Sequence, residues 1–190
     1  MNAEIDIRKT VLKTERLILR AWKEEDVCDL YEYARVDGVG QMAGWLPHKS
    51  IEDSLEILKM FIEEKKTFAL EYQGKVIGSL GIERYNEEKL PEFAGLRCRE
   101  IGYVLAKDYW GRGLMPEAVR EVLRYLFEEV KLDAVFCSHF DWNVQSARVQ
   151  EKTGFTHYMS STYETAAGGW EKDEINLLRR EDWEKQWAEK

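Results

Sequence analysis

The sequence predicts an α+β domain of mixed α/β type, with a mostly antiparallel sheet of about seven strands and helices on both faces. Short segments rich in branched and aromatic residues alternate along the chain with longer segments of helical period. The pair Gln73-Gly74 lies between two of the short segments and indicates a tight antiparallel hairpin. The segment 133–140 follows a helix, so we expect one pair of neighbouring strands to be parallel.

The first part of the chain predicts one strand and two helices. Segment 15–22, ERLILRAW, has the branched residues of a strand, and segment 24–35 places its apolar residues on one helical face. Ser50, with Asp53 three residues later, has the N-cap pattern of a helix that runs to about Glu64.

The central part predicts three strands and the most regular helix. Strands at 67–72 and 75–84 flank the hairpin turn, and a polar loop leads to a strand at 99–106. The helix, from about 114 to 130, has apolar residues at intervals of three and four along one face: Val119, Val122, Leu123, Leu126, Phe127 and Val130.

The last part predicts three strands and two helices. A strand at 133–140 precedes a helix at 143–153, which Gly154 ends in the C′ position. Strands at 155–163 and 173–180 and a short C-terminal helix follow. No repeat or linker divides the 190 residues, so we expect one domain over 1–190.

The charge of the chain disfavours nucleic acid as a partner. It has 28 basic and 36 acidic residues, a net charge of −8, whereas nucleic-acid-binding proteins present a basic surface to phosphates. No apolar run is long enough to span a membrane, and the N-terminal MNAEIDIRKT lacks the apolar core of a signal peptide. We therefore expect a cytoplasmic protein that binds neither nucleic acid nor a membrane.

The cysteines and histidines are scattered along the chain. The cysteines form no C-x-x-C pair, and the histidines lack the spacing of metal ligands. We expect no metal site and no disulfide framework among them: Cys28, Cys98, Cys137, His48, His139 and His157.

The segment Trp110-Gly111-Arg112-Gly113-Leu114-Met115 has the composition of an anion-binding turn. It precedes the most regular helix, where the first N–H groups have no partner and the helix dipole is positive. Gly111 and Gly113 let the backbone approach a ligand, and Arg112 adds a positive charge. Pro116 suits a first helical turn because it has no N–H. The segment lacks the Gly-Lys-Ser/Thr of a P-loop, and Pro116 stands where a dinucleotide-binding turn has its third glycine.

Three segments agree with one known family. They are Thr14-Glu15-Arg16-Leu17-Ile18-Leu19-Arg20 with Asp26; Glu100-Ile101-Gly102-Tyr103-Val104-Leu105 with the glycine segment and Glu117-Ala118; and Asn143-x-x-Ser146 with Glu151-Lys152-Thr153-Gly154-Phe155. In this order they resemble the GNAT superfamily of N-acetyltransferases, and within it the branch of the ribosomal-protein N-terminal acetyltransferases.

The resemblance implies the acyl-CoA N-acyltransferase fold, whose sheet splays between strands 4 and 5, here 99–106 and 133–140, with pantetheine in the opening. It implies acetyl-CoA as co-substrate and suggests a homodimer. Main-chain groups of Val104 and Leu105 and the side chain of Asn143 would bind pantetheine. The pyrophosphate would be held by the N–H groups of Trp110, Gly111, Arg112, Gly113, Leu114 and Met115.

The resemblance also suggests catalytic residues. Glu100 stands at the base position of several family members, and Glu83 is a second candidate base. Ser146, on the helix face that carries Asn143 and Gln150, could protonate the leaving CoA sulfur or orient a water that does. Many members have a tyrosine acid seven residues after the asparagine, where this chain has Gln150, which cannot give up a proton at neutral pH.

The expected acceptor is a primary amine, bound between the 37–49 loop and the 163–173 turn and lined by Trp45 and His48. A protein N-terminus needs only a modest base, because the pKa of an α-amino group is about 7.7–8.0. An amino sugar, a polyamine or an amino acid is the alternative acceptor. A non-catalytic acyl-CoA sensor is a second class of function, and a nucleotide hydrolase is a third.

Overall fold

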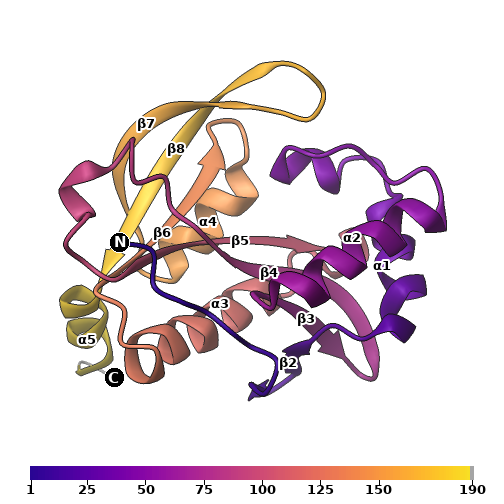
Figure 1. Cartoon of the computed structure of the whole chain (residues 1–190), viewed down its shortest axis with the longest axis horizontal. Coiled ribbons are helices and arrows are strands. Elements are labelled where there is room, and N and C mark those ends of the chain that lie inside the picture. The colour runs from indigo at the N-terminus through magenta and orange to yellow at the C-terminus, as the bar shows by residue number, and fades with distance from the viewer. Residues whose placement is uncertain (189–190) are drawn as a thin grey trace.

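A computed structural model describes residues 1–188 and contains a mixed sheet with helices on both faces (Figure 1). The strand order is β1-β2-β3-β4-β5-β6-β8-β7. The strands are β1 Leu12–Lys13, β2 Leu17–Ala21, β3 Thr67–Tyr72, β4 Lys75–Glu83, β5 Cys98–Leu105, β6 Ala134–Phe140, β7 Thr156–Glu164 and β8 Trp170–Arg179. The α-helices are α1 Val27–Ala34, α2 Ile51–Glu64, α3 Leu114–Arg124, α4 Val144–Lys152 and α5 Arg180–Ala188.

Two elements differ from the sequence prediction. The described sheet is 8-stranded rather than seven-stranded, because the short strand β1 pairs with β2. Two residues are too few to carry an alternating pattern, so nothing in the sequence indicates β1. The helix predicted over 114–130 is α-helical only to Arg124 and continues as a π-helical turn over Tyr125–Glu129.

The predicted turn and helix ends are confirmed. Gln73 and Gly74 have φ of 51° and 81°, the left-handed pair that a type I′ turn requires between β3 and β4. Ser50 Oγ accepts the Asp53 N–H at 3.3 Å where α2 begins. Gly154, with φ of 92°, follows α4. Each signal lies within a few neighbouring residues, which is why the sequence alone predicts it.

Apolar layers cover both faces of the sheet. The helix α3 and the π-helical turn pack on one face, with Val119 and Leu126 in the largest core. The helices α1 and α2 pack on the other face around Leu30 and Leu58. Farther along that second face, the loop after β4 packs over β6 through Phe93.

The parallel strands β5 and β6 are paired over only a short length. Their pairs run from Cys98↔Ala134 to Ile101↔Cys137, after which the two strands separate. Strand β5 continues against β4 on its other side, and β6 continues against β8. The sheet therefore opens between β5 and β6, which are the predicted strands 4 and 5, and β5 has a free edge from Gly102 onward.

Two loops meet over this opening. The tip of the β7–β8 hairpin reaches the loop 37–48 between α1 and α2 (Figure 1), where the Ala166 N–H donates to Gly44 O at 2.9 Å. In the same loop, Met42 O accepts the side-chain amide of Asn143 at 3.1 Å. The loop is thus fixed at two points to the part of the chain beyond the opening.

Arg20 joins β2 to its neighbours through a mostly buried charge network. Its guanidinium donates to both carboxylate oxygens of Asp26, at 2.8 and 2.9 Å, and to Glu71 on β3 at 2.7 Å. Burial alone would raise the pKa of Asp26, but hydrogen bonds from Arg20 and from the Lys23 N–H lower it. Asp26 is therefore ionised in the native fold and holds the start of α1 against the sheet.

Replacing Asp26 with asparagine should lower the free energy of unfolding by about 3 kcal/mol at pH 7, because buried Arg20 loses an ionic partner. The pKa of Asp26 is lower in the folded chain, so its contribution is present above the unfolded-state pKa of about 3.9 and is lost as the pH falls. Urea denaturation over a pH series measures both effects. The exposed pair of Glu32 and Lys75 supplies the control Glu32→Gln, which should change stability by less than about 1 kcal/mol.

Candidate functional site

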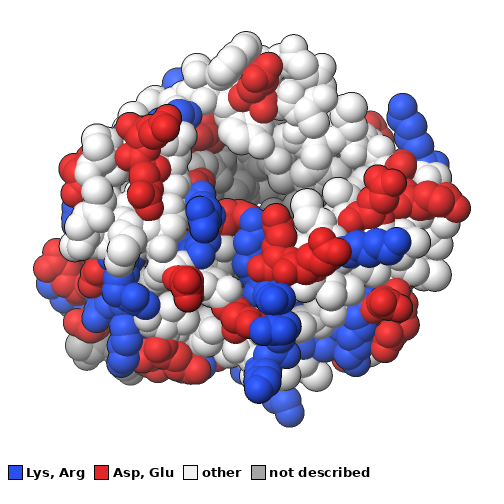
Figure 2. Space-filling view, viewed as in Figure 1, with Lys and Arg blue, Asp and Glu red and all other residues white. Residues whose placement is uncertain are grey.

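A cavity of about 990 Å³ passes through the opening between β5 and β6. Figure 2 shows a hollow beneath the β7–β8 hairpin, with charged side chains along its lower rim. Residues from both faces of the sheet line the cavity, from the loop before α3 to the ends of β4 and β8. A cavity that connects two faces of a sheet can receive two ligands from opposite sides.

The loop before α3 has the geometry of an anion site. Gly111 and Gly113 have φ of 74° and 75°, and Gly113 is the N-cap of α3. In the described part of the chain, the N–H groups of residues 111–115 have no hydrogen-bond acceptor. Trp110 differs, because its backbone N–H donates to the preceding turn and its indole N–H donates to Leu105 O at 2.7 Å. The free donors are therefore those of residues 111–115, and Trp110 fastens the loop to β5.

Positive side chains at this end of the cavity come from α4. Arg148 and Lys152 line the cavity, and their spacing of four places them on one helix face. Arg112 does not line it, because its guanidinium lies over the Tyr109 ring at 5.0 Å. Arg112 thus offers its backbone N–H rather than its charge. The sequence analysis missed Arg148 and Lys152, although their helical spacing was visible.

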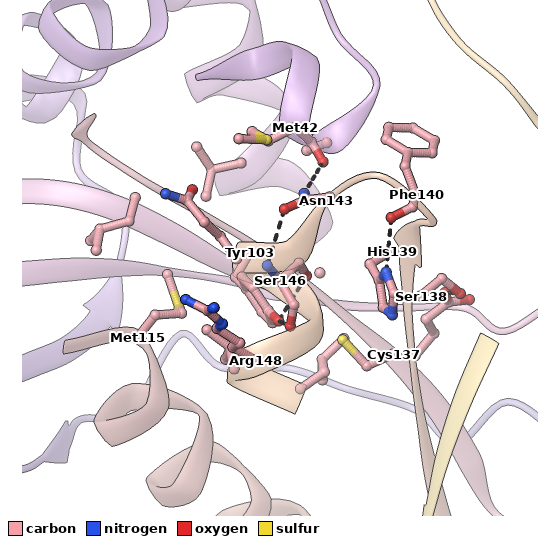
Figure 3. A pocket seen from close by; sticks show the side chains of 18 of the residues that line it. Met42, Tyr103, Met115, Cys137, Ser138, His139, Phe140, Asn143, Ser146 and Arg148 are labelled. Atoms are coloured by element: carbon pink, nitrogen blue, oxygen red, sulfur yellow. Dashed lines mark hydrogen bonds between the residues drawn. The ribbon is translucent and has the colours of Figure 1, made fainter. Parts of the chain in front are cut away.

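Ser146 lies in a cluster of hydroxyl and amide groups (Figure 3). Its Oγ is 3.0 Å from the Tyr103 hydroxyl and accepts a hydrogen bond from Gln150 Nε2 at 3.2 Å. Tyr103 comes from β5, just beyond the point where the strands separate. Burial raises the pKa of Tyr103 well above its usual value, so the hydroxyl stays protonated. The sequence analysis named no role for Tyr103, although it lies within the quoted motif.

Gln150 occupies the helical position at which, by the resemblance, many family members have a tyrosine acid. It is fully buried, and its Nε2 donates to Ser138 O at 3.1 Å as well as to Ser146. Its Oε1 accepts the side-chain N–H of Asn176 on β8 at 2.5 Å. An amide cannot supply a proton at neutral pH. Gln150 therefore fixes α4 against β6 and β8.

Asn143 is the N-cap of α4, and its side chain is engaged at both ends (Figure 3). Oδ1 accepts the Ser146 N–H at 3.0 Å, and Nδ2 donates to Met42 O at 3.1 Å. Nδ2 carries a second N–H, so a contact with pantetheine, as the resemblance implies, could use that donor while the bond to Met42 O stays in place. In the structure, Asn143 joins the loop 37–48 to α4.

Three carboxylates line the other end of the cavity, and we call them the acid face: Glu83 on β4, Glu100 on β5 and Asp173 on β8. Glu83 and Glu100 are direct cross-strand partners. Because alternate residues of a strand face opposite sides, Glu100 and Tyr103 lie on opposite faces of β5. The acid face and the Ser146 cluster therefore approach the opening from opposite sides of the sheet.

The members of the acid face differ in their partners. Glu83 Oε2 lies 2.5 Å from Lys66 Nζ. Glu100 Oε1 accepts the Ser138 hydroxyl at 2.7 Å, and burial raises the pKa of Glu100 in spite of that bond. Burial also raises the pKa of Asp173, to about 6. The sequence analysis missed Asp173, because an acid at the start of a predicted strand gives no sign of what it faces.

The two ring residues predicted at the acceptor site do not line the cavity. Trp45 packs against the core formed with α1 and α2. His48 Nδ1 is hydrogen-bonded with Ser54 Oγ at 2.7 Å, at the first turn of α2. Met42 and Ala43 of the same loop line the cavity instead. The order of residues in a loop does not reveal which side chains turn inward, and here the larger rings turn toward the core.

The described residues contain no helix with the length and apolarity needed to cross a membrane. They also contain no group of at least three His, Cys, Asp or Glu side chains arranged to hold a metal ion.

Comparison with known proteins agrees with this geometry. Residues 16–156 match the family model described as an acetyltransferase (GNAT) domain. The uncharacterized N-acetyltransferase YoaA of Bacillus subtilis (strain 168) is 30% identical over 152 residues, 76% of this chain and 82% of that protein. The putative ribosomal N-acetyltransferase YdaF of the same organism is 30% identical over 115 residues, 60% of this chain and 58% of that protein.

A solved structure shows the same fold. The microcin C7 self immunity acetyltransferase MccE, in complex with acetyl-CoA and AMP, has a TM-score of 0.71 at 16% identity, covering 87% of this chain and 93% of that chain. At this identity the likeness concerns the fold alone, whereas the family match covers most of the present sequence. The chain, with its sheet opened beside a glycine-rich helix start, belongs to the GNAT family of N-acetyltransferases.

Proposed function

We propose that this protein transfers the acetyl group of acetyl-CoA to a primary amine, such as the N-terminal amine of a protein, within a ternary complex. The cavity through the sheet carries this proposal, because it has free N–H groups at one end and three carboxylates at the other. The first end suits a diphosphate, and the second suits a cationic amine. The opening between them is where the acetyl group and the amine would meet.

Acetyl-CoA fits the first end by charge and by backbone geometry. The N–H groups of residues 111–115 lie at the positive end of the α3 dipole and would hold the pyrophosphate. Arg148 and Lys152 add positive charge to the same cavity. The free edge of β5 at Val104 and Leu105 would bind the amide groups of pantetheine as an added strand does. Acetyl-CoA supplies the activated acetyl carbonyl.

The acceptor nitrogen must lose two protons during the transfer. The ammonium gives the first proton to a carboxylate of the acid face, where Glu100 and Glu83 are the predicted bases. The nitrogen then bonds to the acetyl carbon and the carbon–sulfur bond breaks. The second proton passes from the nitrogen to the leaving thiolate, through Ser146 or a water beside it. The products are the acetylated amine, the free thiol and one proton that returns to solvent.

The surroundings of Ser146 favour its role as a proton relay. A serine hydroxyl alone is a poor acid, but Oγ lies within hydrogen-bond distance of Gln150 Nε2 and the Tyr103 hydroxyl, at 3.2 and 3.0 Å. Donors directed at this oxygen stabilise the negative charge that develops when it gives its proton away. Tyr103 and Gln150 therefore position Ser146, which is the group nearest the sulfur in this proposal.

A protein acceptor is supported by exposed aromatic side chains around the cavity mouth. Tyr163 lines the cavity and is 47% exposed, and Trp142, which is 46% exposed, stacks on Phe140 of the cavity lining. Aromatic side chains of this kind are enriched where proteins bind one another. The name of YdaF, a putative ribosomal N-acetyltransferase, points in the same direction. An amino sugar, a polyamine or an amino acid is the alternative, and a small amine would not need this aromatic surface.

A thiol-release assay distinguishes an acetyltransferase from a non-catalytic acyl-CoA sensor. With acetyl-CoA and a panel of peptides and small amines, the enzyme should release thiol only when an amine is present. Tight CoA binding without thiol release from any member of the panel would identify a non-catalytic sensor. Magnesium-dependent ATP binding would instead indicate a nucleotide hydrolase.

The Gly111→Ala variant tests the anion site. An alanine is strained at the left-handed φ of 74° by about 1–2 kcal/mol, so the loop should relax and turn its N–H groups away from the ligand. We expect CoA affinity, measured by calorimetry, to fall about tenfold or more. Gly74→Ala is the matched control, because Gly74 has a φ of 81° in the β3–β4 turn and does not line the cavity. Equal CoA affinity in the two variants would contradict the assignment.

The Ser146→Ala variant tests the proton relay. We expect kcat to fall about 100-fold and the Kd of CoA to stay nearly unchanged. The Tyr103→Phe variant should lower kcat about tenfold, because it removes a hydroxyl that is hydrogen-bonded with Oγ. Steady-state kinetics and calorimetry give both quantities. The control is Ser160→Ala on β7, a serine bonded to Glu174 outside the cavity. A Ser146→Ala variant with normal kcat would rule out this relay.

A further inference from the structure

Asp173 differs from the other two carboxylates of the acid face because it lacks a partner. No hydrogen bond or ion pair joins its carboxylate to any described side chain, although it is only 7% exposed and lines the cavity. Glu83 is paired with Lys66, and Glu100 holds the Ser138 hydroxyl. A buried carboxylate without a partner is costly, and its position on the cavity wall indicates a ligand that supplies one.

Strand register places Asp173 beside the opening and on the same face as Glu100. On β6, Ser138 pairs with Ile175, and Phe140 pairs with Asp173. The Ser138 side chain donates to Glu100, so positions 138 and 140 and their partners 175 and 173 share that face. All of these side chains line the cavity. Asp173 therefore lies on the same face as Glu100 but farther along β6, beside Phe140, whereas Glu100 lies beside Phe136.

The charged groups around Asp173 come from several elements. Burial is the largest effect on the pKa of Asp173 and raises it, and the neighbouring Glu174 raises it further. Lys89 and His139 lower it. The resulting pKa is about 6. The proximity of Asp173 also helps to raise the pKa of Glu100 on β5. Lys89 Nζ is hydrogen-bonded to β7 instead, at 2.7 and 3.1 Å. The cationic partner of Asp173 is therefore left to a ligand.

We propose that Asp173 binds the ammonium group of the acceptor and accepts its first proton, and that the acceptor is a cationic primary amine without an anionic group next to its nitrogen. This inference rests on the proposed function, and it names the base and the acceptor class for that reaction. Glu100 stands beside Asp173 as a second carboxyl group, and burial and Asp173 both raise its pKa. A free amino acid is disfavoured, because its carboxylate would meet the negative charge of Asp173. A peptide N-terminus and an alkyl amine share the favoured chemistry.

The proton balance follows from this placement. An N–H bond of the ammonium breaks, and its proton bonds to a carboxylate oxygen of Asp173. The freed electron pair bonds to the acetyl carbon while the carbon–sulfur bond breaks. The second proton leaves the nitrogen for the thiolate on the opposite face, at Ser146. Because the pKa of Asp173 is about 6, Asp173 returns its proton to solvent at neutral pH before the next cycle.

Asp173→Asn is the direct test. At pH 7.5 we expect kcat/KM for an amine to fall about 100-fold, with the Kd of CoA unchanged within about twofold. In the wild type, kcat/KM should rise as the pH increases through about 6, because only the ionised carboxylate binds the ammonium. This rise, the acid limb of the pH profile of kcat/KM, should be absent from the variant. Asp141→Asn makes the same charge change at a 42% exposed side chain outside the cavity, and it should leave both activity and the limb intact.

Thermal stability separates this role from a structural one. The pKa of Asp173 is about 6 in the folded chain, above the value of about 3.9 expected when unfolded, so its ionisation opposes folding. Stability is lost as the pH rises between these two values. Asp173→Asn should therefore raise Tm at pH 7.5 while it lowers kcat/KM. A lower Tm together with lost activity would show that Asp173 is structural and would overturn the proposal.

A second variant assigns the acid limb. His139 also lines the cavity, and its charge acts on Asp173. His139→Asn should keep the limb if Asp173 is the base. A limb that persists in Asp173→Asn and disappears in His139→Asn would assign it to the histidine and refute the proposal.

Four acceptors test the proposed class with the wild-type protein: alaninamide, alanine, a short peptide and 1,4-diaminobutane. Alaninamide and alanine differ only in the carboxylate, and we expect thiol release with alaninamide to be at least tenfold faster. Faster release with alanine would overturn the acceptor class. Preference for the peptide indicates a protein N-terminus, and preference for the diamine indicates a small alkyl amine. Thiol release from none of them, with CoA binding intact, refutes the proposed function itself, whereas rapid release by Asp173→Asn refutes only the role of Asp173.

Discussion

The separation of β5 from β6 is the constraint on which the site depends. Paired strands lie about 4.8 Å apart, which leaves no room for a ligand between them. Pairing stops at Ile101↔Cys137, and from there the edge of β5 and the space beside it become available. The connection from β5 to β6 also explains where the proposed anion site lies, because parallel strands need a crossover and here the crossover contains α3. The N-terminus of α3 is therefore brought to the end of β5, next to the opening.

The alternation of side chains along β5 divides the chemistry between the two faces. Glu100 and Tyr103 are three residues apart and point to opposite sides, one toward the acid face and the other toward Ser146. A proton acceptor and a proton donor on the same side would bond to each other and lose their separate functions. Placed on opposite sides of an open sheet, each group would face a different atom of the proposed reaction, the amine nitrogen or the thiolate sulfur.

Features encoded by neighbouring residues could be predicted from the sequence, and those created by packing could not. The turn at Gln73-Gly74 and the helix start near Gly113 depend on local conformation, and both are present. The engagement of Trp110 with Leu105 O and the isolation of Asp173 depend on segments distant in the chain, so no local pattern indicates them. Trp45 shows the same limit, because whether a loop side chain turns to the core or to a cavity is decided by its packing. The fold was thus predictable from the sequence, and much of the cavity lining was not.

Gln150 shows why a departure from a family pattern need not remove a function. Its amide is bonded to Ser138 O, Ser146 Oγ and Asn176, so a tyrosine ring at this position would displace the contacts that hold α4 against β6 and β8. A phenol is nevertheless present in the cluster, because Tyr103 reaches Ser146 from β5. Gln150 also links the two sides of the site, since it bonds the backbone of Ser138 while the Ser138 hydroxyl bonds Glu100. Ser146 and Glu100 of the acid face are thus positioned by one continuous set of hydrogen bonds, and a shift of α4 would move both.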